Sequence, residues 1–292
     1  MVSLFALLFS LLLVLSCQKE ISPGLIQRGN GIDSNGIGLL NKIVSTYTVD
    51  NLDYYTQEFE YDSADRLWVV TNTLKTKQAN GTITIKSGAV QFFRDGLGRI
   101  IRIGSRPDTS SINSFINYEN ATSGKVTSVY YVKTTAGGST VIDSVEFVYD
   151  ANNHVIRTNR YSDAFPGQIE GYQLYQYDAM GNITEHKNML DLDSNGTFEV
   201  NFIFSWQYDN KINPSYHPEH ALFEWGQGWP IINSPNNLIK HINFPPSIPN
   251  IEIVYSYQYD SLGRPIKMMH GANTNGGPDI YDSTNITKYY YN

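Results

Sequence analysis

The segment DLDSNGTFEV carries acidic and amide side chains at alternating positions, a pattern typical of loops that bind calcium through oxygen atoms. Asp191, Asp193 and Asn195 lie two residues apart and a glycine follows, as at the start of an EF-hand loop. Glu199 stands at the ninth position, but the twelfth is Phe202, where an EF-hand needs a bidentate carboxylate. Two interpretations stay open: a calcium site made by the four oxygen-bearing side chains, or a polar hairpin loop without metal. No other cofactor is expected.

A second candidate site is the segment HPEHALFEWGQGWPIINSPNN, residues 217–237, which interrupts the alternating apolar pattern around it. Trp225 and Trp229 flank Gly-Gln-Gly, and Tyr216 directly precedes the segment. Flat aromatic rings on a loop bind sugars by stacking, and a polar side chain such as Gln227 would orient the sugar hydroxyls. The other interpretation is that the loop folds back and buries both indoles, since large apolar side chains mostly cover a core.

The histidines do not show the spacing of a metal site. His217 and His220 flank Pro-Glu, which is not the HExxH order, and Pro218 opposes a helix through that segment. The sequence also lacks a GxSxG elbow, a P-loop and a dinucleotide-binding fingerprint. Paired carboxylates on strands would leave no local signature. The chain is therefore predicted to be non-enzymatic, with a polysaccharide hydrolase as the remote alternative.

These segments lie between copies of one recurring pattern: aromatic, any residue, Tyr, Asp, two spacers, Gly or Asn, polar, aliphatic. Its five copies are FEYDSADRL (59–67), FFRDGLGRI (92–100), FVYDANNHV (147–155), YQYDAMGNI (175–183) and YQYDSLGRP (257–265). Two weaker relatives are INYENATSGKV (116–126) and WQYDNKINP (206–214). The repetition indicates a protein built from one supersecondary unit.

The pattern predicts a β-hairpin. Residues at i and i+2 of a strand face the same side, so Tyr257 and Tyr259 present their rings to one face. Asp260 suits the first position of a type I turn, and Gly263 suits the position that needs a positive φ. The residues assigned this structural role are Asp62, Asp95, Gly98, Asp150, Asp178, Gly181, Asp260 and Gly263.

Substitutions within the repeat support the turn. Asp65 and Asn153 replace the glycine in two copies, and these residue types best tolerate a left-handed conformation. Arg66, Arg99 and Arg264 begin the second strand, where a long cation can lie over a cross-strand tyrosine. The YD unit is therefore interpreted as a turn and not as a catalytic motif.

Composition and spacing predict the fold class. Tyr (21) outnumbers Phe (13) and Trp (4), and no stretch after the apolar first residues shows a sustained apolar period of 3.6 residues. The chain is therefore predicted to be all-β. Seven hairpins would give on the order of 12 to 14 strands, and an open sheet of that width curls or splits. We expect a long twisted antiparallel meander, curled or open, with residues 39–292 as one domain and an insertion at about 210–250. The last segment, NITKYYYN, would be an edge strand open to dimerisation.

The first residues, MVSLFALLFSLLLVLSC, form an apolar run too short for a membrane span of ~20 residues. The run ends at Cys17, the only cysteine of the chain, and resembles the lipobox of bacterial lipoproteins. The resemblance implies a signal peptide at 1–16 and a lipidated Cys17 followed by a Gly/Asn/Ser-rich tether at 17–38. An ordinary secretory signal with a chance cysteine is the alternative.

The net charge and the residues after Cys17 indicate which partners the protein binds and where in the cell it is located. The net charge of −7 and the absence of a basic run argue against binding of nucleic acid. QKE directly after the cysteine resembles the export signals of Gram-negative surface lipoproteins. An outer-membrane lipoprotein is therefore predicted, with the cell surface slightly favoured over the periplasmic face.

The pattern YDxxGR resembles the YD or RHS repeat, which builds β-hairpin shells in large secreted toxins and adhesion proteins. The combination of lipobox, tether, YD units, YDNKINP and a closing YQYDSLGRP looks like small surface lipoproteins of unknown function, over about residues 39–292. The resemblance implies a non-enzymatic envelope scaffold or adhesion surface, with the membrane and a protein or glycan as partners. The alternative is a glycan-binding lipoprotein of the nutrient-capture type that uses the aromatic loop at 216–237.

Overall fold

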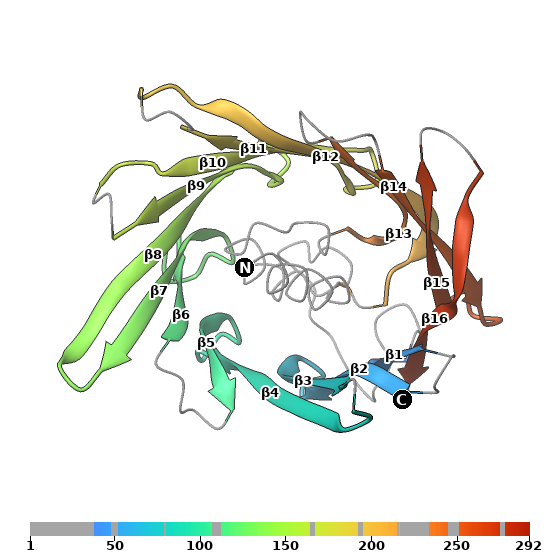
Figure 1. Ribbon diagram of the computed structural model, residues 1–292. Coiled ribbons are helices and arrows are strands. Elements are labelled where there is room, and N and C mark those ends of the chain that lie inside the picture. The colour runs from blue at the N-terminus through green and yellow to red at the C-terminus, as the bar shows by residue number, and fades with distance from the viewer. Residues whose placement is uncertain are drawn as a thin grey trace.

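The computed structural model describes residues 38–47, 52–78, 80–106, 112–163, 167–191, 195–214, 216, 234–244, 251–274 and 278–292. In these ranges sixteen β-strands form one closed antiparallel barrel (Figure 1). The strands are β1 (Leu40–Tyr47), β2 (Leu52–Tyr61), β3 (Leu67–Lys77), β4 (Ile83–Arg94), β5 (Ile100–Arg106), β6 (Ile112–Tyr118), β7 (Val126–Thr135), β8 (Gly138–Tyr149), β9 (Val155–Ser162), β10 (Gly171–Tyr177), β11 (Ile183–Leu190), β12 (Glu199–Ile212), β13 (Asn236–Phe244), β14 (Ile251–Tyr259), β15 (Pro265–Thr274) and β16 (Ile280–Tyr291). Cys17 and the predicted signal peptide and tether before residue 38 lie outside the described residues.

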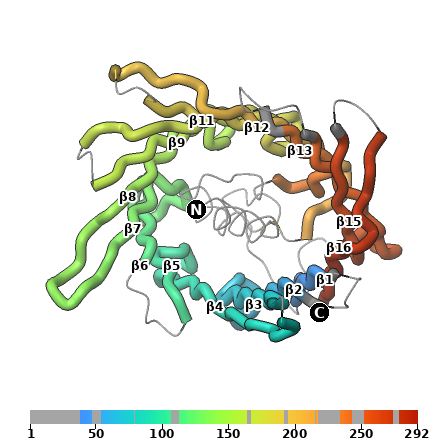
Figure 2. The backbone as a smooth tube through the Cα atoms, in the orientation of Figure 1, coloured from blue at the N-terminus to red at the C-terminus, as the bar shows by residue number. Residues whose placement is uncertain are grey.

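Each strand pairs with its neighbours in sequence, and β1 also pairs with β16, which closes the ring (Figure 2). The predicted all-β, antiparallel architecture is confirmed. The predicted open or curled sheet is wrong, because β1 precedes the first repeat and pairs with the last strand. This pairing removes both sheet edges. The edge that we expected to be open to dimerisation is therefore covered by β1.

The turns of the five strong repeats share one hydrogen-bonding pattern. At Asp260, the carbonyl oxygen accepts from Gly263 N at 3.0 Å, and Oδ1 accepts from Leu262 N and Arg264 N at 2.9 and 3.0 Å. Gly263 has a φ of 76°, and the glycine substitutes Asp65 and Asn153 have φ values of 55° and 64°. Aspartate thus organises the turn, and the fourth residue supplies the left-handed backbone.

The cation after the turn connects one hairpin to the next. Arg264 donates from Nε to Asp260 Oδ2 at 2.7 Å, and its guanidinium lies 4.4 Å from the centroid of the Tyr291 ring. Arg99 lies at the same distance over Tyr118. Each tyrosine belongs to the following hairpin, so the cation contacts the neighbouring unit and not the tyrosine of its own hairpin.

The same tyrosines explain why the repeat needs a hydroxyl group. Each one donates to the backbone carbonyl of the aliphatic residue that begins the second strand of the preceding hairpin. These bonds run from Tyr61 to Leu40, Tyr118 to Ile100, Tyr149 to Val126, Tyr177 to Val155, Tyr208 to Ile183 and Tyr291 to Pro265, at 2.7–2.9 Å. In β4 the guanidinium of Arg94 reaches Leu67 O in the same way. Together these bonds link each hairpin to the next around the barrel. A typical hydrogen bond contributes about 1 kcal/mol to the free energy of unfolding.

The two ends of the described chain complete an eighth turn. Asn292 N donates to Leu39 O at 3.0 Å, the bond that Asp260 N makes to Arg264 O within a continuous turn. Asn41 Nδ2 donates to Asn292 Oδ1 at 2.6 Å. A Cβ atom on Gly38 would lie 2.5 Å from Asn292 O, so this approach requires glycine. The β16–β1 seam is therefore a hairpin whose turn is divided between the chain ends.

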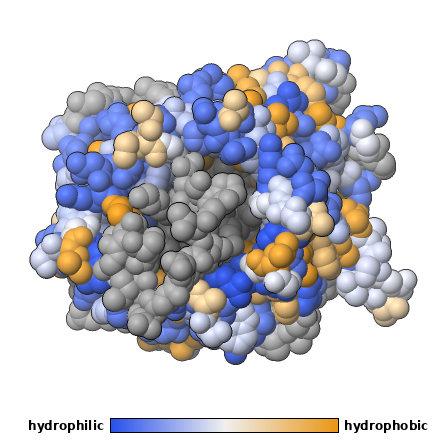
Figure 3. All heavy atoms as spheres, turned by 180° about the vertical axis from the view of Figure 1, so that it is seen from behind, coloured by the Kyte–Doolittle hydropathy of each residue, from blue (hydrophilic) through white to orange (hydrophobic). Residues whose placement is uncertain are grey.

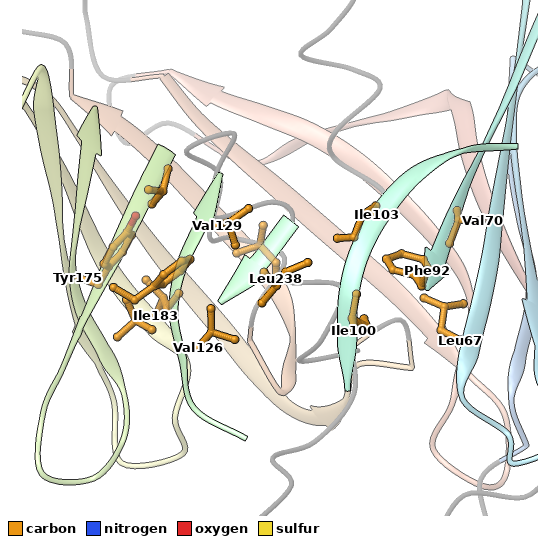
Figure 4. Close-up of a cluster of buried hydrophobic side chains, with 14 of the residues drawn as sticks. Leu67, Val70, Phe92, Ile100, Ile103, Val126, Val129, Tyr175, Ile183 and Leu238 are labelled. Carbon is orange, nitrogen blue, oxygen red and sulfur yellow. The ribbon is translucent and has the colours of Figure 1, made fainter. Parts of the chain in front are cut away.

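The two faces of the wall differ in polarity. The inner face is apolar: Val70, Phe92 and Ile103 are at most 2% exposed, and their side chains lie on the inner side of the wall (Figure 4). The outer face carries ion pairs between neighbouring strands, such as Lys42 with Glu58 at 2.7 Å. The face seen in Figure 3 is mainly hydrophilic, with separate hydrophobic patches.

Candidate functional site

The inner wall changes character between β10 and β13. The second strand of every hairpin presents an inward residue three positions after its first aliphatic residue. In order along the chain, this residue is Ile43, Val70, Ile103, Val129, Thr158, His186, His241 and Met268. Two consecutive hairpins thus place histidine where the others mostly have an aliphatic side chain. We call His186, Trp206 and His241, with Tyr175 and Phe204 beside them, the histidine–aromatic band.

The rings of this band stack along the wall. The Tyr175 and His186 ring centroids are 5.1 Å apart with planes 17° apart. His186 and Trp206 follow at 6.0 Å and 10°, and Trp206 and His241 at 6.0 Å and 28°. Antiparallel pairing sets this spacing, because His186 pairs with Phe204 across β11–β12 and Trp206 pairs with His241 across β12–β13.

Both imidazoles of the band are buried without hydrogen-bond partners. His186 is 0% exposed and His241 is 2% exposed. Both ring nitrogens of each are buried and unpartnered in the described part of the protein, as are Trp206 Nε1 and the Tyr255 hydroxyl. Buried polar groups almost always have partners, and each one left unsatisfied costs about 1–3 kcal/mol. Such a concentration on neighbouring strands marks this sector as the candidate functional site.

Burial also sets the charge of the band. Desolvation lowers the pKa of His186 to about 3 and that of His241 to about 4, so both rings are neutral at pH 7. A neutral imidazole offers one N–H donor and one nitrogen acceptor. Burial raises the pKa of the adjacent Tyr175 hydroxyl, which keeps it protonated. The band is therefore a buried, uncharged group of side chains that contains both hydrogen-bond donors and acceptors.

Sequence reasoning missed this site, because the spacing of His186 and His241 matches no metal or catalytic motif. The signal was present in the repeat. Ile183 and Leu238 are the first aliphatic residues of their strands, and a histidine follows three positions later in both. Alignment of the second strands would have shown the change from Val or Ile to His.

The predicted aromatic loop joins β12 to β13, at the position of the sixth turn. Trp225, Trp229 and Gln227 lie outside the described residues. Tyr216 is 7% exposed, and its backbone N–H donates to Asn213 O at 3.2 Å. The structure thus places Tyr216 at the base of the insertion, and the glycan-binding set as a whole stays a prediction.

A buried polar network holds the two ends of this insertion. Asn182 Nδ2 donates to Asp178 Oδ2 in the fifth turn at 2.8 Å and to Asn236 Oδ1 at 3.0 Å. Asn236 N donates back to Asn182 Oδ1 at 3.1 Å, and Ile183 N donates to Ser234 Oγ at 3.1 Å. These amide groups satisfy one another, so we assign them a structural role in fixing the base of the insertion.

The turn of the sixth hairpin also takes part in a different tyrosine hydrogen bond from the others. The Tyr259 hydroxyl donates to Asp209 Oδ2, and Asn237 Nδ2 contacts both carboxylate oxygens at 3.3–3.4 Å. Tyr259 therefore bonds the aspartate of the interrupted turn, where the other tyrosines bond a backbone carbonyl. Desolvation, followed by the hydrogen bond to Asp209, raises the pKa of the Tyr259 hydroxyl.

The candidate calcium residues lie at the β11–β12 turn. Asp191 accepts from Asn195 N at 3.0 Å and from Gly196 N at 2.9 Å, and Asn195 Oδ1 accepts from Thr197 N at 2.7 Å. Glu199 begins β12 opposite Leu190, whereas Asp193 lies outside the described residues. Within the described ranges there is no group of three or more His, Cys, Asp or Glu residues that could hold a metal ion. Calcium binding stays a prediction.

One comparison with a solved structure supports the fold. A porin-like protein from Bacteroides uniformis aligns with a TM-score of 0.53 and 14% identity, over 87% of this chain and 96% of that one. A porin-like protein from Bacteroides vulgatus gives 0.39 and 12%, over 87% and 98%. A solved complex of TcdB2, TccC3 and Cdc42 gives 0.30 and 12%, over 77% of this chain and 12% of that one. No family model and no curated protein matches the chain.

Proposed function

We propose that this protein is a lipid-anchored, non-enzymatic barrel of the cell envelope that acts as a scaffold or interaction surface with its outer wall in water. The observation that carries the proposal is the set of ion pairs on the outer face of the strands. Lys187 lies 2.9 Å from Glu185 in β11, Lys240 pairs with Glu252 across β13–β14, and Arg106 lies 2.7 Å from Glu60.

Such a wall is unsuited to the interior of a membrane. A lysine or arginine on the lipid-facing side of a barrel costs about 2–4 kcal/mol at the bilayer midplane. Membrane-spanning barrels face lipid with apolar residues and enclose a polar interior, whereas this barrel places Phe92, Ile103 and Val129 inside. The porin-like architecture is thus combined with the opposite arrangement of polarity. As a separate finding, no helix among the described residues is long and apolar enough to cross a membrane.

The anchor fits this placement. Gly38, the first described residue, lies in the eighth turn, at the same end of the barrel as the other YD turns. A tether from Cys17 to Gly38 would hold the barrel to the outer membrane by this end, with the cell surface as the favoured side. The YD-repeat lipoprotein resemblance supports the same address, and a protein partner would bind the water-facing wall.

Glycan capture by the insertion is the second candidate function. It is favoured by the hydrogen bonds from Asn236 Nδ2 to Lys211 O and from Asn213 N to Pro235 O, which join the two ends of the segment that carries Trp225 and Trp229. Trp229→Ala is expected to weaken binding of a matching oligosaccharide strongly and to leave folding unchanged. Binding that is unaffected when both indoles are replaced would rule out this loop as the platform.

Cysteine labelling tests the placement of the wall. Cys17 is the only cysteine, and lipidation would consume its thiol, so Lys187→Cys would introduce a single reactive thiol into the full chain. We expect a membrane-impermeant maleimide to label it in opened membranes as fast as Asn80→Cys, a matched control in the exposed β3–β4 turn. Protection of Lys187→Cys with a reactive Asn80→Cys would mean that the wall lies in lipid.

Metabolic labelling tests the anchor separately. The wild-type chain is expected to incorporate labelled palmitate, and Cys17→Ser is expected to lose the label entirely. Gln18→Ala, which changes the adjacent residue and keeps the thiol, serves as the control. Label retained in Cys17→Ser would contradict lipidation at this residue.

A further inference from the structure

We propose that the end of the barrel that carries the YD turns docks on the surface of a lipid bilayer, with apolar side chains at the tips of three turns inserted among the lipid headgroups. We call these residues, Leu97, Met180 and Leu262, the apolar tips. The inference deepens the proposed function and rests on its lipid anchor, because the anchor brings this end to the membrane. It adds a contact between the folded barrel and lipid, which a tether alone does not supply.

The apolar tips occupy one position of the turn, two residues after its aspartate. Leu97, Met180 and Leu262 are 61%, 66% and 61% exposed. In each turn the backbone N–H of this residue donates to the aspartate Oδ1, at 2.9, 2.8 and 2.9 Å. Ala64 and Asn152 make the same bond in two other turns, both at 2.8 Å. The turn therefore uses only the backbone of this residue, and its large apolar side chain has no role in forming the turn.

The apolar tips are spread around the rim and do not form one patch. They belong to the hairpins β4–β5, β10–β11 and β14–β15, which lie in different sectors of the ring (Figure 1). The hairpin β8–β9, with Asn152 at the same turn position, lies between the first two of them. A protein partner binds a continuous patch, whereas three separated points on one rim define a plane. A flat bilayer surface can contact all three tips at once.

A second set of apolar side chains lies just behind the rim on the outer face. Trp68, Ile101, Ile156 and Ile266 each follow the buried residue that begins the second strand of a hairpin, and they are 38–42% exposed. A surface that binds the membrane interface buries its apolar side chains about 5–10 Å into the headgroup region, where tryptophan is also enriched. The apolar tips would enter first, and these four residues follow at the level where the strands begin.

The charges of the same turns are paired, which makes the approach to lipid easier. Three turns hold an arginine and an aspartate 2.7 Å apart: Arg66 with Asp62, Arg99 with Asp95, and Arg264 with Asp260. Each pair lies within one turn and carries no net charge to the bilayer surface. The ion pair of Lys187 and Glu185 lies further along its strand, so an upright barrel keeps this part of the wall in water.

The opposite end of the barrel differs in the residues that a flat surface would meet first. In the described part of that end, the turns carry polar or small residues such as Asn80, Gly137 and Asn195. Ile83 and Ile85, which are 48% and 62% exposed, lie on β4 and not at the tip of a turn. Asn80, Ile83 and Ile85 therefore provide matched controls for the tip positions and for exposed apolar side chains in general.

The position of the tether makes a modest apolar contact sufficient. Gly38 lies in the eighth turn of the same rim, where Asn292 N donates to Leu39 O. A Gly/Asn/Ser-rich tether of about 20 residues has a root-mean-square length of roughly 25 Å. Lipid at Cys17 would hold the rim within this distance of the bilayer, so docking becomes an intramolecular step at a high effective concentration.

Fluorescence quenching in the full-length lipidated chain tests the contact. The chain is reconstituted into vesicles of phosphatidylethanolamine and phosphatidylglycerol with an environment-sensitive dye on Asn152→Cys, which reports on the rim and keeps all three apolar tips. Lipidation consumes the Cys17 thiol, so the wild-type chain should take up no dye. We expect lipids with a nitroxide group in the acyl chain to quench the dye at residue 152 at least about twofold, and the dye on Asn80→Cys only slightly.

Serine at the apolar tips separates docking from tethering. Leu97→Ser, Met180→Ser and Leu262→Ser, combined in the Asn152→Cys chain, keep the backbone N–H that each turn uses and remove the apolar side chains. We expect this combination to remove at least about half of the quenching. Ile83→Ser and Ile85→Ser, which remove exposed apolar side chains near the opposite end, should leave the quenching unchanged.

Three results would overturn the inference. Equal quenching at residues 152 and 80 would mean that the rim has no preference for lipid. Quenching that survives the three serine replacements would mean that the tether alone brings the rim close. Blue-shifted emission at residue 152 without quenching by lipid would mean that a protein, such as a second copy of this chain, covers the rim.

Palmitate incorporation separates these results from a failure of the proposed function. Palmitate label without quenching at residue 152 would keep the anchor and reject docking of the rim. Quenching at residue 152 without palmitate label would keep the docking and reject the anchor.

Discussion

Strands β2–β9 and β10–β13 build the same inner wall from the same type of hairpin. They differ at the position three residues after the first aliphatic residue of each second strand. In the first region this position holds Val70, Ile103, Val129 and Thr158, mostly hydrocarbon packed against Phe or Ile. In the second it holds His186 and His241, packed against Tyr, Phe and Trp. Both regions share the turn and the hydrogen bonds from tyrosine hydroxyls to backbone carbonyls. The hairpin therefore sets the architecture, and the residue at this one inward position sets the chemistry of the wall.

The largest expected effect lies in the aliphatic region. Phe92→Ala removes a 2% exposed ring from the packed inner wall and should lower the free energy of unfolding by about 3–5 kcal/mol. Urea denaturation measures the change, with Ile101→Ala, at a 41% exposed position on the neighbouring strand, as the control. A loss below about 1 kcal/mol would show that this part of the wall is not close-packed.

Acid should destabilise the histidine region selectively. The pKa values of His186 and His241, about 3 and 4, lie below the ordinary value of about 6.5, so the unfolded chain binds more protons between these values. Stability is therefore lost as the pH falls from about 6.5 towards 4, by about 2 kcal/mol per histidine at pH 5.

Urea denaturation at pH 7.5 and pH 5 measures this loss, and the double variant His186→Phe/His241→Phe should show most of it removed. Asp62 and Asp260, whose pKa values are lowered by hydrogen bonds from Arg66 and Arg264 despite an opposing effect of burial, act only below about pH 4. An equal loss in wild type and double variant would contradict buried, neutral imidazoles.

The turns should respond alike in both regions. Gly98 and Gly263 have φ values of 83° and 76°, so Gly→Val at either site should cost at least about 1 kcal/mol. Gly98→Val should cost more, because its Cβ would lie 2.1 Å from Arg66 Nη1, whereas nothing lies within 4 Å at Gly263. Thermal unfolding measures both. If Gly263→Val left the unfolding temperature unchanged, the shared turn would not require a residue in the left-handed conformation.

The smallest expected change in the free energy of unfolding has opposite signs in the two regions. His241→Phe removes two unsatisfied nitrogens and keeps a ring, so in the ligand-free chain at pH 7.5 it should be neutral or raise the free energy of unfolding by about 1 kcal/mol. Val129→Ala, at the same position of an aliphatic hairpin, should lower it by about 1–3 kcal/mol. A marked loss in His241→Phe would indicate that the imidazole already has a hydrogen-bond partner.

Much of the architecture could be predicted from the sequence, because it depends on residues that are close together in the chain. The Asp–Gly spacing predicts the turns, and the alternation of tyrosines predicts which rings share a face, as at Tyr257 and Tyr259, whose ring centroids lie 5.9 Å apart. Closure was not readable, because it depends on β1 meeting β16 across almost the whole sequence. No local residue pattern reports whether two distant edges pair, and the eighth turn is divided between Gly38 and Asn292.

The candidate site was less predictable for a related reason. His186 and His241 are 55 residues apart in sequence numbering and become neighbours only through the pairing of β11, β12 and β13. Their spacing matches no metal or catalytic motif, so a search for such motifs passes over them. The predicted calcium residues Asp191 and Asn195 do share a turn, where their oxygens accept backbone N–H groups.

The measurement that tests the account most directly is the nitrogen-15 NMR spectrum of the imidazole rings in the wild-type chain, recorded at pH 7.5 and at pH 5. We predict that the ring nitrogens of His186 and His241 keep the resonances of neutral imidazole at both pH values, because burial lowers their pKa values to about 3 and about 4. Resonances of protonated imidazole at both residues at pH 5 would contradict a buried, neutral histidine–aromatic band.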